Sequence, residues 1–321
     1  MEKPDLSIIM PVFNAGKYLR QAVDSVLQQE SINSCYCLPS FELIVIDDAS
    51  TDPVSLAVLA EVSNLDKRIR VVSNVRPKGA AGARNTGIRE AAGTWIGFLD
   101  ADDIWYKDSL SLRWHAICAN PSINWIATKF ELLKPDIFSG SDESFGGNLL
   151  DSRSLKSQEI LPQASRLKRP VESFGRECLI GIMTVLIRRE IVVTVGMFDE
   201  TLPRSEDYHL WFKCAVQNDL FLLDIKTAFY RIHAESLTHG VAPRHLHEDK
   251  MLDMMKVDPR FYDYKKIISK RLDFVYQDQC FFYRGNKMYG KAFLSAVQWL
   301  SQSPANRSAW KEILAGILRR G

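Results

Sequence analysis

The first hundred residues alternate between short, continuously apolar runs and longer segments whose apolar residues recur every three or four positions. Residues 6–12 (LSIIMPV) form such a run and end at turn residues, which is typical of a buried strand. Asn14 precedes a helical pattern over residues 16–29, and we expect it to cap that helix. The alternation goes on to predict a strand at 41–46, a helix at 53–65, a strand at 70–73, a helix at 80–92 and a strand at 95–99.

Strands that alternate with helices indicate an α/β fold, with a mixed, mostly parallel sheet and helices on both of its faces. Ligands of such sheets bind at the carboxyl ends of the strands. Asp47 and Asp48 follow the second expected strand, and Asp100, Asp102 and Asp103 follow the fourth. The sequence therefore places two acidic clusters at the edge where a ligand is expected.

The pattern weakens between residues 134 and 180 and then becomes regular again. We expect one domain over residues 1–240, with halves at 1–105 and 106–240, followed by a helical extension over 241–321. The elements expected after residue 180 are a strand at 180–188, a short helix at 189–195, an amphipathic segment at 206–216, an extended segment at 220–231, and a helix pair at 271–283 and 287–300.

Composition narrows the class of protein. The chain has 321 residues, of which 46% are hydrophobic and 25% charged, as in globular proteins, and its net charge of +2 gives no reason to expect a nucleic-acid partner. The six cysteines lie mostly inside apolar patterns, which indicates buried thiols in a reducing compartment. No apolar run has the length of a signal peptide core or a membrane span, so we expect a soluble, cytoplasmic protein.

The last 35 residues carry many more basic than acidic side chains, unlike the chain as a whole. They carry a single acidic residue, Glu312, and two interpretations remain open: a solvated helix face, or contact with an anionic membrane surface or partner, which would place the protein at the inner face of a membrane. The basic residues of this stretch are Lys287, Lys291, Arg307, Lys311, Arg319 and Arg320.

Like charges crowded at a strand end need an explanation, because each ionised pair about 4 Å apart repels by roughly 4 kcal/mol at an effective dielectric near 20. A calcium loop that began at Asp100 would need glycine at its sixth position and glutamate at its twelfth, where the chain has Trp105 and Ser111. A dinucleotide fold needs G-x-G-x-x-G after the first strand, where the chain has PVFNAGKYL. A haloacid-dehalogenase-like phosphatase would leave Asp47 and Asp48 without a role.

The chain resembles the inverting family 2 glycosyltransferases through motifs that occur in the same order. These are SIIMPVFNAGKYLRQAVDSVLQQ (7–29), LIVIDDASTD (43–52), GAAGARNTGIREAAGTWIGFLDADD (79–103), GMFDETLPRSEDYHLWFKCA (196–215) and, more weakly, YRIHAESLT (230–238). The resemblance implies the Rossmann-like GT-A fold over residues 1–240, with a nucleotide-binding half at 1–105 and an acceptor-side half at 106–240. It also implies transfer of a sugar from a nucleotide-diphospho-sugar, expected to be a UDP-sugar, to a hydroxyl of a glycan or a lipid-linked acceptor in polysaccharide synthesis.

The D-x-D at Asp100–Asp102 is the implied metal and diphosphate site. Asp102 matches the metal-bridging carboxylate of the family, Asp100 matches the position nearer the ribose, and His233 matches a histidine that related enzymes often place near the metal. Mn²⁺ or Mg²⁺ suits such oxygen ligands and stabilises a departing diphosphate. The cluster is therefore expected to hold a divalent cation together with the donor.

The nucleotide slot is implied by the other motifs. One of Asp47 and Asp48 is expected to accept a hydrogen bond from the base, although the pair also has the composition of turn caps. Arg84 matches a position that faces the nucleotide or the donor sugar, but pairing with a strand-end aspartate is equally open. The remaining residues expected at the slot are Pro11, Phe13, Asn14, Gly79 and Asn85.

Direct displacement at the anomeric carbon needs a base that takes the proton of the acceptor hydroxyl. By resemblance Asp207 has this role, with Glu206 as the alternative, and one displacement inverts the anomeric configuration. Two other functions stay open from sequence: a nucleotide-sugar-binding scaffold without catalysis, and a sugar-nucleotidyltransferase. The segment Asn14–Lys17 is poor in glycine for the second of these.

Overall fold

The computed structural model describes residues 3–34, 36–133, 153, 163–232 and 244–318 of the chain. The chain divides into two compact units, the first built from residues 1–170 and 178–233 and the second from residues 171–177 and 234–321. Residues 171–177, which the sequence analysis included in the acceptor-side half, thus pack with the helical second unit.

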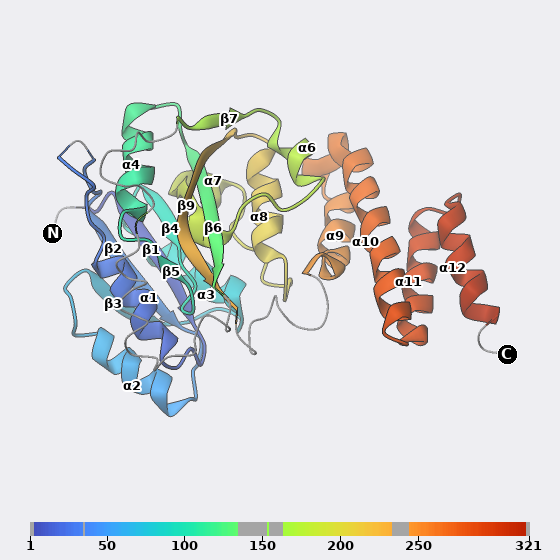
Figure 1. Ribbon diagram of the computed structural model, residues 1–321, viewed down its shortest axis with the longest axis horizontal. Helices are drawn as coiled ribbons and strands as arrows, with labels where there is room; N and C mark the ends of the chain where they lie inside the picture. The colour runs from blue at the N-terminus through green and yellow to red at the C-terminus, as the bar shows by residue number, and fades with distance from the viewer. Residues whose placement is uncertain (1–2, 35, 134–152, 154–162, 233–243, 319–321) are drawn as a thin grey trace. The chain divides into compact units, whose positions relative to one another are not determined.

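The first unit begins with three strand–helix pairs and a fourth strand (Figure 1). The expected strands and helices are all present here, within a few residues of the expected bounds, because continuous apolar runs and helical spacing specify such elements locally. They are β1 (Leu6–Val12), α1 (Tyr18–Leu27), β2 (Phe41–Asp47), α2 (Pro53–Val62), β3 (Ile69–Ser73), α3 (Ala80–Glu90) and β4 (Trp95–Phe98).

The rest of the first unit mixes short strands with helices. The expected strand at 180–188 is replaced by a 3-10 turn, η2 (Ile182–Thr184), and a three-residue strand, β8 (Leu186–Arg188). The other elements are β5 (Ile104–Trp105), α4 (Ser109–Ala119), β6 (Trp125–Leu133), β7 (Ser165–Leu167), α7 (Arg189–Thr194), α8 (Glu206–Ala215) and β9 (Leu220–Arg231).

The strands of the described residues form one mixed sheet in the order β3-β2-β1-β4-β8-β6-β9-β5, with β7 paired to β9. The pairings among β3, β2, β1 and β4 are all parallel, and antiparallel pairing begins at β8. In register, Val12 is opposite Asp47 and Ile9 is opposite Phe98. The residues that follow β1, β2 and β4 therefore emerge at one edge of the sheet, which carries both acidic clusters.

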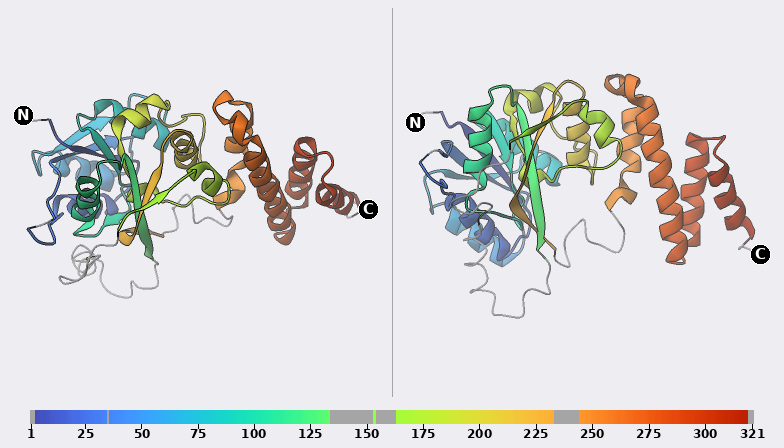
Figure 2. Two further views of the ribbon diagram at one scale, coloured as in Figure 1. Left: turned by 90° about the horizontal axis from the view of Figure 1, so that it is seen from above. Right: turned by 45° about the horizontal axis from the view of Figure 1, so that its top comes forward.

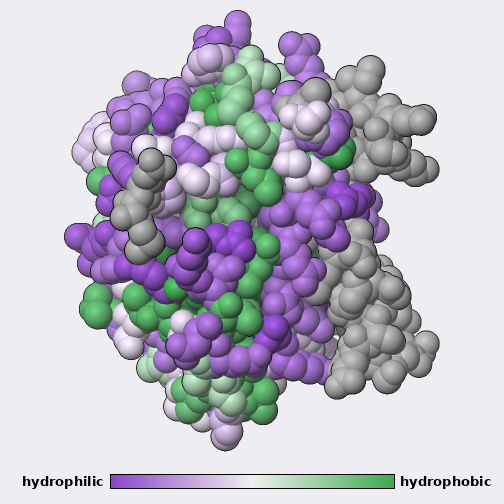
Figure 3. Space-filling model, turned by 90° about the vertical axis from the view of Figure 1, so that its left-hand side faces the viewer, coloured by the Kyte–Doolittle hydropathy of each residue, from purple (hydrophilic) through white to green (hydrophobic). Residues whose placement is uncertain are grey.

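Helices cover the two faces of the sheet, as Figure 2 shows. Ile8 of β1 belongs to an apolar cluster with Val23 of α1 and Leu110 of α4. On the other face, Trp211 of α8 stacks on Trp125 of β6, with ring centroids 5.8 Å apart. The surface of the unit is mixed in character, and Figure 3 shows apolar surface at the end of one face where α2 lies.

Small residues let α3 lie close against its neighbours. A Cβ added at Gly87 would stand 2.6 Å from Ile9 Cγ2, and one at Gly82 would stand 1.9 Å from the Pro77 carbonyl oxygen. These two glycines therefore serve the close packing of α3 against β1 and the preceding loop. Gly79 differs, since its φ is +128° and no atom lies within 4 Å of the added Cβ.

Two further expectations need correction. Asn14 does not cap α1; its Oδ1 accepts the backbone N–H groups of Thr51 and Asp52, so it joins the loops after β1 and β2. The cysteines are not uniformly buried. All five described cysteines are free thiols, of which Cys37 and Cys118 are exposed and Cys178 is half-buried, with Cys214 and Cys280 buried.

The second unit is helical. Its buried ion pair joins Arg271 Nε to Glu248 Oε2 at 2.8 Å, and Trp299 Nε1 donates to Asp273 Oδ1 at 2.7 Å. None of the described helices of the chain is both long and apolar enough to cross a bilayer. The elements from residue 170 onward that belong here are α6 (Pro170–Phe174), η3 (Arg244–His247), α9 (Asp249–Val257), η4 (Pro259–Tyr264), α10 (Lys265–Gly285), α11 (Tyr289–Gln302) and α12 (Arg307–Leu318).

Candidate active site

The strand-end aspartates occupy a tight turn between β4 and β5. The Asp103 N–H donates to the Asp100 carbonyl oxygen at 3.1 Å. Asp103 is 1% exposed, Asp102 is half-buried and the Asp100 side chain is 24% exposed. The turn therefore presents Asp100 and Asp102 toward solvent and keeps Asp103 inside.

Arg84 of α3 connects this turn to α8. Its Nη2 donates to Asp100 Oδ1 and its Nη1 donates to Glu206 Oε1, each at 2.7 Å. The Arg84 side chain is only 5% exposed, and its Nε has no partner within the described residues. Of the two alternatives that the sequence left open, the structure has the pairing with a strand-end aspartate.

The charges of this group act strongly on one another. Burial lowers the pKa of Arg84, but the carboxylates of Asp100 and Glu206 outweigh burial and raise it above its usual value. Burial raises the pKa of Asp100, and the nearby Asp102 raises it further. Burial likewise raises the pKa of Glu206, and Asp207 raises it further. In both cases the positive charge of Arg84 opposes the rise. Asp207 acts electrostatically on both Arg84 and Asp100, so these residues surround one site.

Asp207 lies in the first turn of α8 and is 7% exposed. The helix is entered through Ser205, whose φ of +59° is left-handed and whose buried Oγ has no partner within the described residues. Non-glycine residues in this conformation cluster at functional sites, where the surrounding structure maintains the strain. The entry to α8 thus places Glu206 and Asp207 next to the strand-end turn.

Asp103 and Arg231 fix the turn from behind. Asp103 Oδ1 accepts the backbone N–H of Arg231 at 2.9 Å, and Arg231 Nε donates to the Asp102 carbonyl oxygen at 2.8 Å. Burial first, and then the neighbouring Asp102 and Asp100, raise the pKa of Asp103 well above its usual value. Asp103 Oδ2 has no partner within the described residues. Burial and the neighbouring carboxylates therefore disfavour ionisation of Asp103.

Asp48 organises the loop that leads into α3. Its Oδ2 accepts the Gly79 N–H at 2.8 Å and its Oδ1 accepts Asn74 Nδ2 at 2.6 Å. Asp47 Oδ1 accepts the Ser50 N–H at 3.0 Å within the turn after β2. Both aspartates therefore have structural hydrogen bonds of the kind that turn caps make, whatever further bond either accepts from a ligand.

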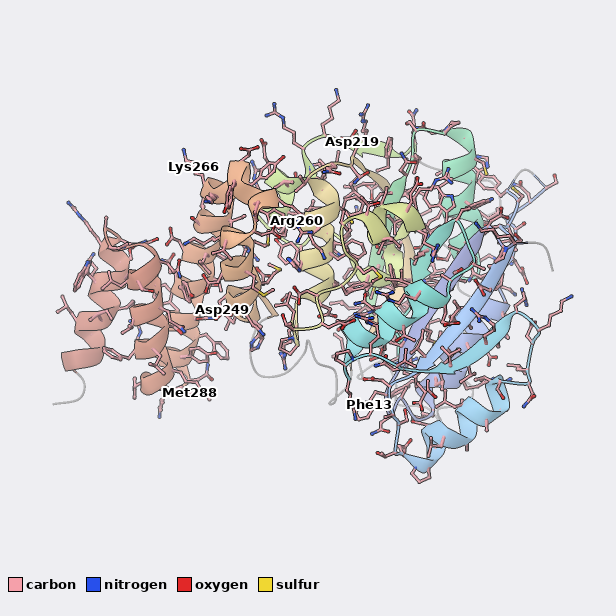
Figure 4. The ribbon with its side chains drawn as sticks, turned by 180° about the vertical axis from the view of Figure 1, so that it is seen from behind. Phe13, Asp219, Asp249, Arg260, Lys266 and Met288 are labelled. Atoms are coloured by element: carbon pink, nitrogen blue, oxygen red, sulfur yellow. The ribbon has the colours of Figure 1, made fainter. Side chains whose placement is uncertain are left out.

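The loops after β1 and β3 meet at Phe13. Its ring, labelled in Figure 4, is 49% exposed, and Lys78 Nζ lies 3.8 Å from the ring centroid. Pro11 lies at the end of β1 and is half-buried. An exposed aromatic ring and a lysine thus stand at the sheet edge that carries the acidic clusters.

Asn85 holds the segment that precedes α8. Its Oδ1 accepts the Phe198 N–H at 2.9 Å, and its Nδ2 donates to the Phe198 carbonyl at 2.9 Å and to Glu200 Oε1 at 2.7 Å. Glu200 also pairs with Arg76. The amide of Asn85, which is 2% exposed, is therefore used within the protein, a role for which its local sequence carries no signal.

The residues at the turn fit a divalent cation that is shared with a ligand. Carboxylate oxygens are the donors that Mg²⁺ and Mn²⁺ prefer, and Asp103 Oδ2 is a buried carboxyl oxygen without a partner in the described part of the chain. No group of three or more His, Cys, Asp or Glu within the described ranges is arranged to hold a metal by itself. His233, the other expected metal residue, lies outside the described residues.

Comparison with known proteins identifies the family. A family model described as Glycosyl transferase family 2 matches residues 7–159. The UDP-Glc:alpha-D-GlcNAc-diphosphoundecaprenol beta-1,3-glucosyltransferase WfgD of Escherichia coli is 31% identical over 215 residues, which cover 67% of this chain and 71% of that protein. The chain belongs to glycosyl transferase family 2. An uncharacterized glycosyltransferase of Haemophilus influenzae is 39% identical over 241 residues, covering 74% of this chain and 83% of that one.

Solved structures agree in fold with this family 2 glycosyltransferase. S. aureus TarS 1-349 in complex with UDP-GlcNAc superposes with a TM-score of 0.60 at 16% identity, covering 93% of this chain and 81% of that one. The mannosyltransferase PcManGT from Pyrobaculum calidifontis, in complex with GDP-Man and Mn²⁺, gives 0.56 at 17% identity and covers 99% and 81%. The longer TarS chain is matched over 49% of its length. These likenesses confirm the expected GT-A fold.

Two residues at the site were missed by sequence reasoning. Arg231 donates to the backbone carbonyl of Asp102. It lies two residues before His233 in the motif YRIHAESLT, and a charged residue at the end of a strand was the one feature that could have indicated its role. Ser205 directly precedes Glu206, but its left-handed backbone has no signature in the sequence. Both residues lie inside the motifs at 196–215 and 230–238, but the motifs do not indicate these contacts.

Proposed function

We propose that this glycosyltransferase transfers a sugar, with inversion, from a UDP-sugar to a hydroxyl of a saccharide carried on a polyprenyl diphosphate. The observation that supports this most directly is the bridge from Asp100 through Arg84 to Glu206, because it brings the strand-end turn beside Asp207. The WfgD relative, which is named for UDP-Glc and a diphosphoundecaprenol acceptor, supports the donor and the acceptor class.

The residues divide the reaction between two sides of the site. Asp102, with Asp100 beside it, would hold Mn²⁺ or Mg²⁺, and the cation would stabilise charge on the departing diphosphate. Asp207 would accept the proton of the acceptor hydroxyl as that oxygen attacks the anomeric carbon. Glu206 is engaged by Arg84, which favours Asp207 as the base.

The nucleotide would lie over the loops that Asp48 and Asn14 organise. The exposed ring of Phe13 is positioned to stack on the base, with Lys78 beside it. Gly79, whose backbone N–H is held by Asp48, leaves open space where a side chain would otherwise stand. Preformed loops of this kind reduce the ordering that binding requires.

The test is a donor panel on the full chain with Mn²⁺, in which UDP-sugars and GDP-mannose are offered with a synthetic GlcNAc-diphosphoprenol. We expect release of UDP and a product of inverted anomeric configuration by NMR. In a parallel reaction with added pyrophosphate, formation of UTP and a sugar 1-phosphate from the UDP-sugar would instead indicate a nucleotidyltransferase. Donor binding without any release of UDP would indicate a binding scaffold, and a product of retained configuration would overturn the single displacement.

A further inference from the structure

The last two helices carry large apolar and basic side chains on their outward faces. Leu294 and Val297 of α11 are 62% and 42% exposed, and Trp310 and Leu314 of α12 are 50% and 55% exposed. A spacing of three or four residues places each pair on one face of its helix. Each helix is therefore amphipathic with an uncovered apolar stripe.

The opposite faces of both helices are used inside the second unit. Gly316 of α12 packs on Phe293 of α11, since a Cβ at Gly316 would stand 2.8 Å from Phe293 Cδ2. Ser295, Ala296 and Trp299 of α11 are buried. The stripes with Leu294 and Trp310 thus face away from the bundle that α10, α11 and α12 form.

Basic residues accompany these stripes. Lys291 precedes Leu294 by three positions, Arg307 precedes Trp310 by three, and Lys311 precedes Leu314 by three; all three basic residues are exposed. Glu312, the acidic residue of this stretch, has its carboxylate 2.5 Å from Arg284 Nη1 on α10. The outward faces therefore combine apolar and positive character without an exposed acid on α11 or α12.

The turn between α10 and α11 extends this surface. Lys287, Met288 and Tyr289 are exposed there, and Figure 4 shows Met288 at the end of the helical unit where the two helices meet. Because α11 and α12 run antiparallel, the end of α12 that contains Leu314 lies toward this turn. We define the outer surface as residues 287–289 with the outward faces of α11 and α12.

The charges decide between two occupants of the outer surface. A second copy of the chain that packed the same face against it would bring Lys291 and Lys311 toward like charges, which is unfavourable. An anionic lipid surface complements these lysines and accepts the apolar side chains between them. Trp310 suits the boundary of such a surface because its indole N–H already donates to the Pro304 carbonyl at 3.0 Å.

We propose that the outer surface binds the headgroup region of an anionic lipid bilayer. Leu294, Val297, Trp310 and Leu314 enter the boundary between headgroups and acyl chains, and Lys287, Lys291, Arg307 and Lys311 contact the lipid phosphates. This inference goes beyond the proposed function, since it depends on the second unit alone. None of the described helices could span a bilayer. Binding through the outer surface would bring the protein to a lipid-linked acceptor that is held in a membrane.

The test is flotation of the full chain with phosphatidylcholine vesicles, with and without phosphatidylglycerol. We expect binding to the anionic vesicles that weakens when the salt is raised from about 50 mM to about 500 mM, where charges are screened. Trp310→Ser/Leu314→Ser and Lys291→Glu/Lys311→Glu should each reduce binding at least about tenfold. Leu56→Ser/Lys67→Glu, which changes exposed residues of the first unit, is the matched control and should bind as the parent does.

Circular dichroism establishes that the variants fold, and donor hydrolysis is measured in the same preparations. Equal binding to neutral and anionic vesicles, or no binding at all, overturns the proposal. Concentration-dependent self-association that the same variants abolish, with no vesicle binding, shows a second copy as the occupant and also overturns it. Vesicle binding needs no catalysis, so its failure is distinct from a failure of the proposed reaction.

Discussion

The guanidinium of Arg84 lies 2.7 Å from a carboxylate oxygen of Glu206, a residue 122 positions later in the chain. Its other terminal nitrogen, Nη2, lies at the same distance from Asp100 Oδ1. One buried side chain of α3 thus joins the end of β4 to the first turn of α8 and holds the carboxylates of Asp100 and Glu206 in place.

Replacement of Arg84 by methionine should destabilise the protein. The change leaves Asp100 and Glu206 without their shared cation in a largely buried setting, for which a loss of about 3 kcal/mol in the free energy of unfolding is typical. Urea denaturation at pH 7 measures it. Arg89→Met, on the exposed side of the same helix, should change stability by less than about 0.5 kcal/mol. Arg84→Met/Glu206→Gln should lose less than the two single variants together, and strict additivity would contradict the bridge.

Replacement of Asp207 by asparagine should abolish turnover while donor binding persists. Loss of a general base typically lowers the rate by about 10²–10⁴-fold, whereas asparagine preserves the shape of the side chain. Steady-state UDP release gives the rate, and calorimetric titration with UDP gives the affinity. Asp224→Asn, at an exposed site on β9, is the matched control and should remain fully active. An unchanged rate in Asp207→Asn would remove this residue from the role of base.

Removal of the divalent cation should weaken donor binding, because the strand-end carboxylates then face the diphosphate uncompensated. UDP affinity in Mn²⁺ should exceed that in EDTA by about tenfold or more, as a cation that bridges carboxylate and diphosphate contributes directly to binding. Asp102→Asn should reduce this difference, and Asp224→Asn should preserve it. Equal affinity with and without metal in the parent protein would argue against a metal-bridged donor.

The Glu200 carboxylate should make stability depend on pH. Its hydrogen bonds with Arg76, and then with Asn85, lower the pKa of Glu200 below its ordinary value. Because the pKa is lower in the folded protein, this carboxylate stabilises the fold above the unfolded pKa of about 4.3, and the contribution is lost as pH falls through the folded value. Glu200→Gln should therefore be less stable than the parent at pH 7 by about 1.5 kcal/mol.

The difference for Glu200→Gln should stay constant from pH 8 to about pH 5 and narrow only below about pH 4. Urea denaturation across this range measures it, with Glu190→Gln, an exposed change on α7, as the control. A difference that grew toward low pH would contradict the direction of the shift.

Much of the fold could be predicted from the sequence. The bounds of β1 and β9 match the expected ones, since a continuous apolar run and a long alternating segment specify strands locally. For residues 106–133 the sequence analysis predicted no helix or strand. In α4 the stretch Leu110–Trp114 alternates like a strand, and β5 has only two residues, so neither gives a clear period. The short pieces η2 and β8 are defined by their neighbours in the sheet.

The sequence indicated which residues belong to the candidate site, but not which of them contact one another. Family motifs pointed to Asp100, Asp102 and Asp207, and these lie around one site. The partner of Arg84 stayed open because a pairing over 122 residues leaves no local pattern. Asn85 and Asp48 were assigned to ligands from motif positions, whereas their structural hydrogen bonds depend on loops that meet only in the folded chain.

The three hydrogen bonds of the Asn85 amide have a consequence for how the enzyme recognises its substrates. They join Phe198 and Glu200, just ahead of α8, to α3, so a hinge motion of this stretch would have to break them. The segment that leads into α8 and Asp207 is thus held by hydrogen bonds within the protein itself. Under the proposed function, a preference among acceptors at this segment would depend on a shape that exists without ligand, and a new preference would arise by exchanging side chains there rather than by altering a motion.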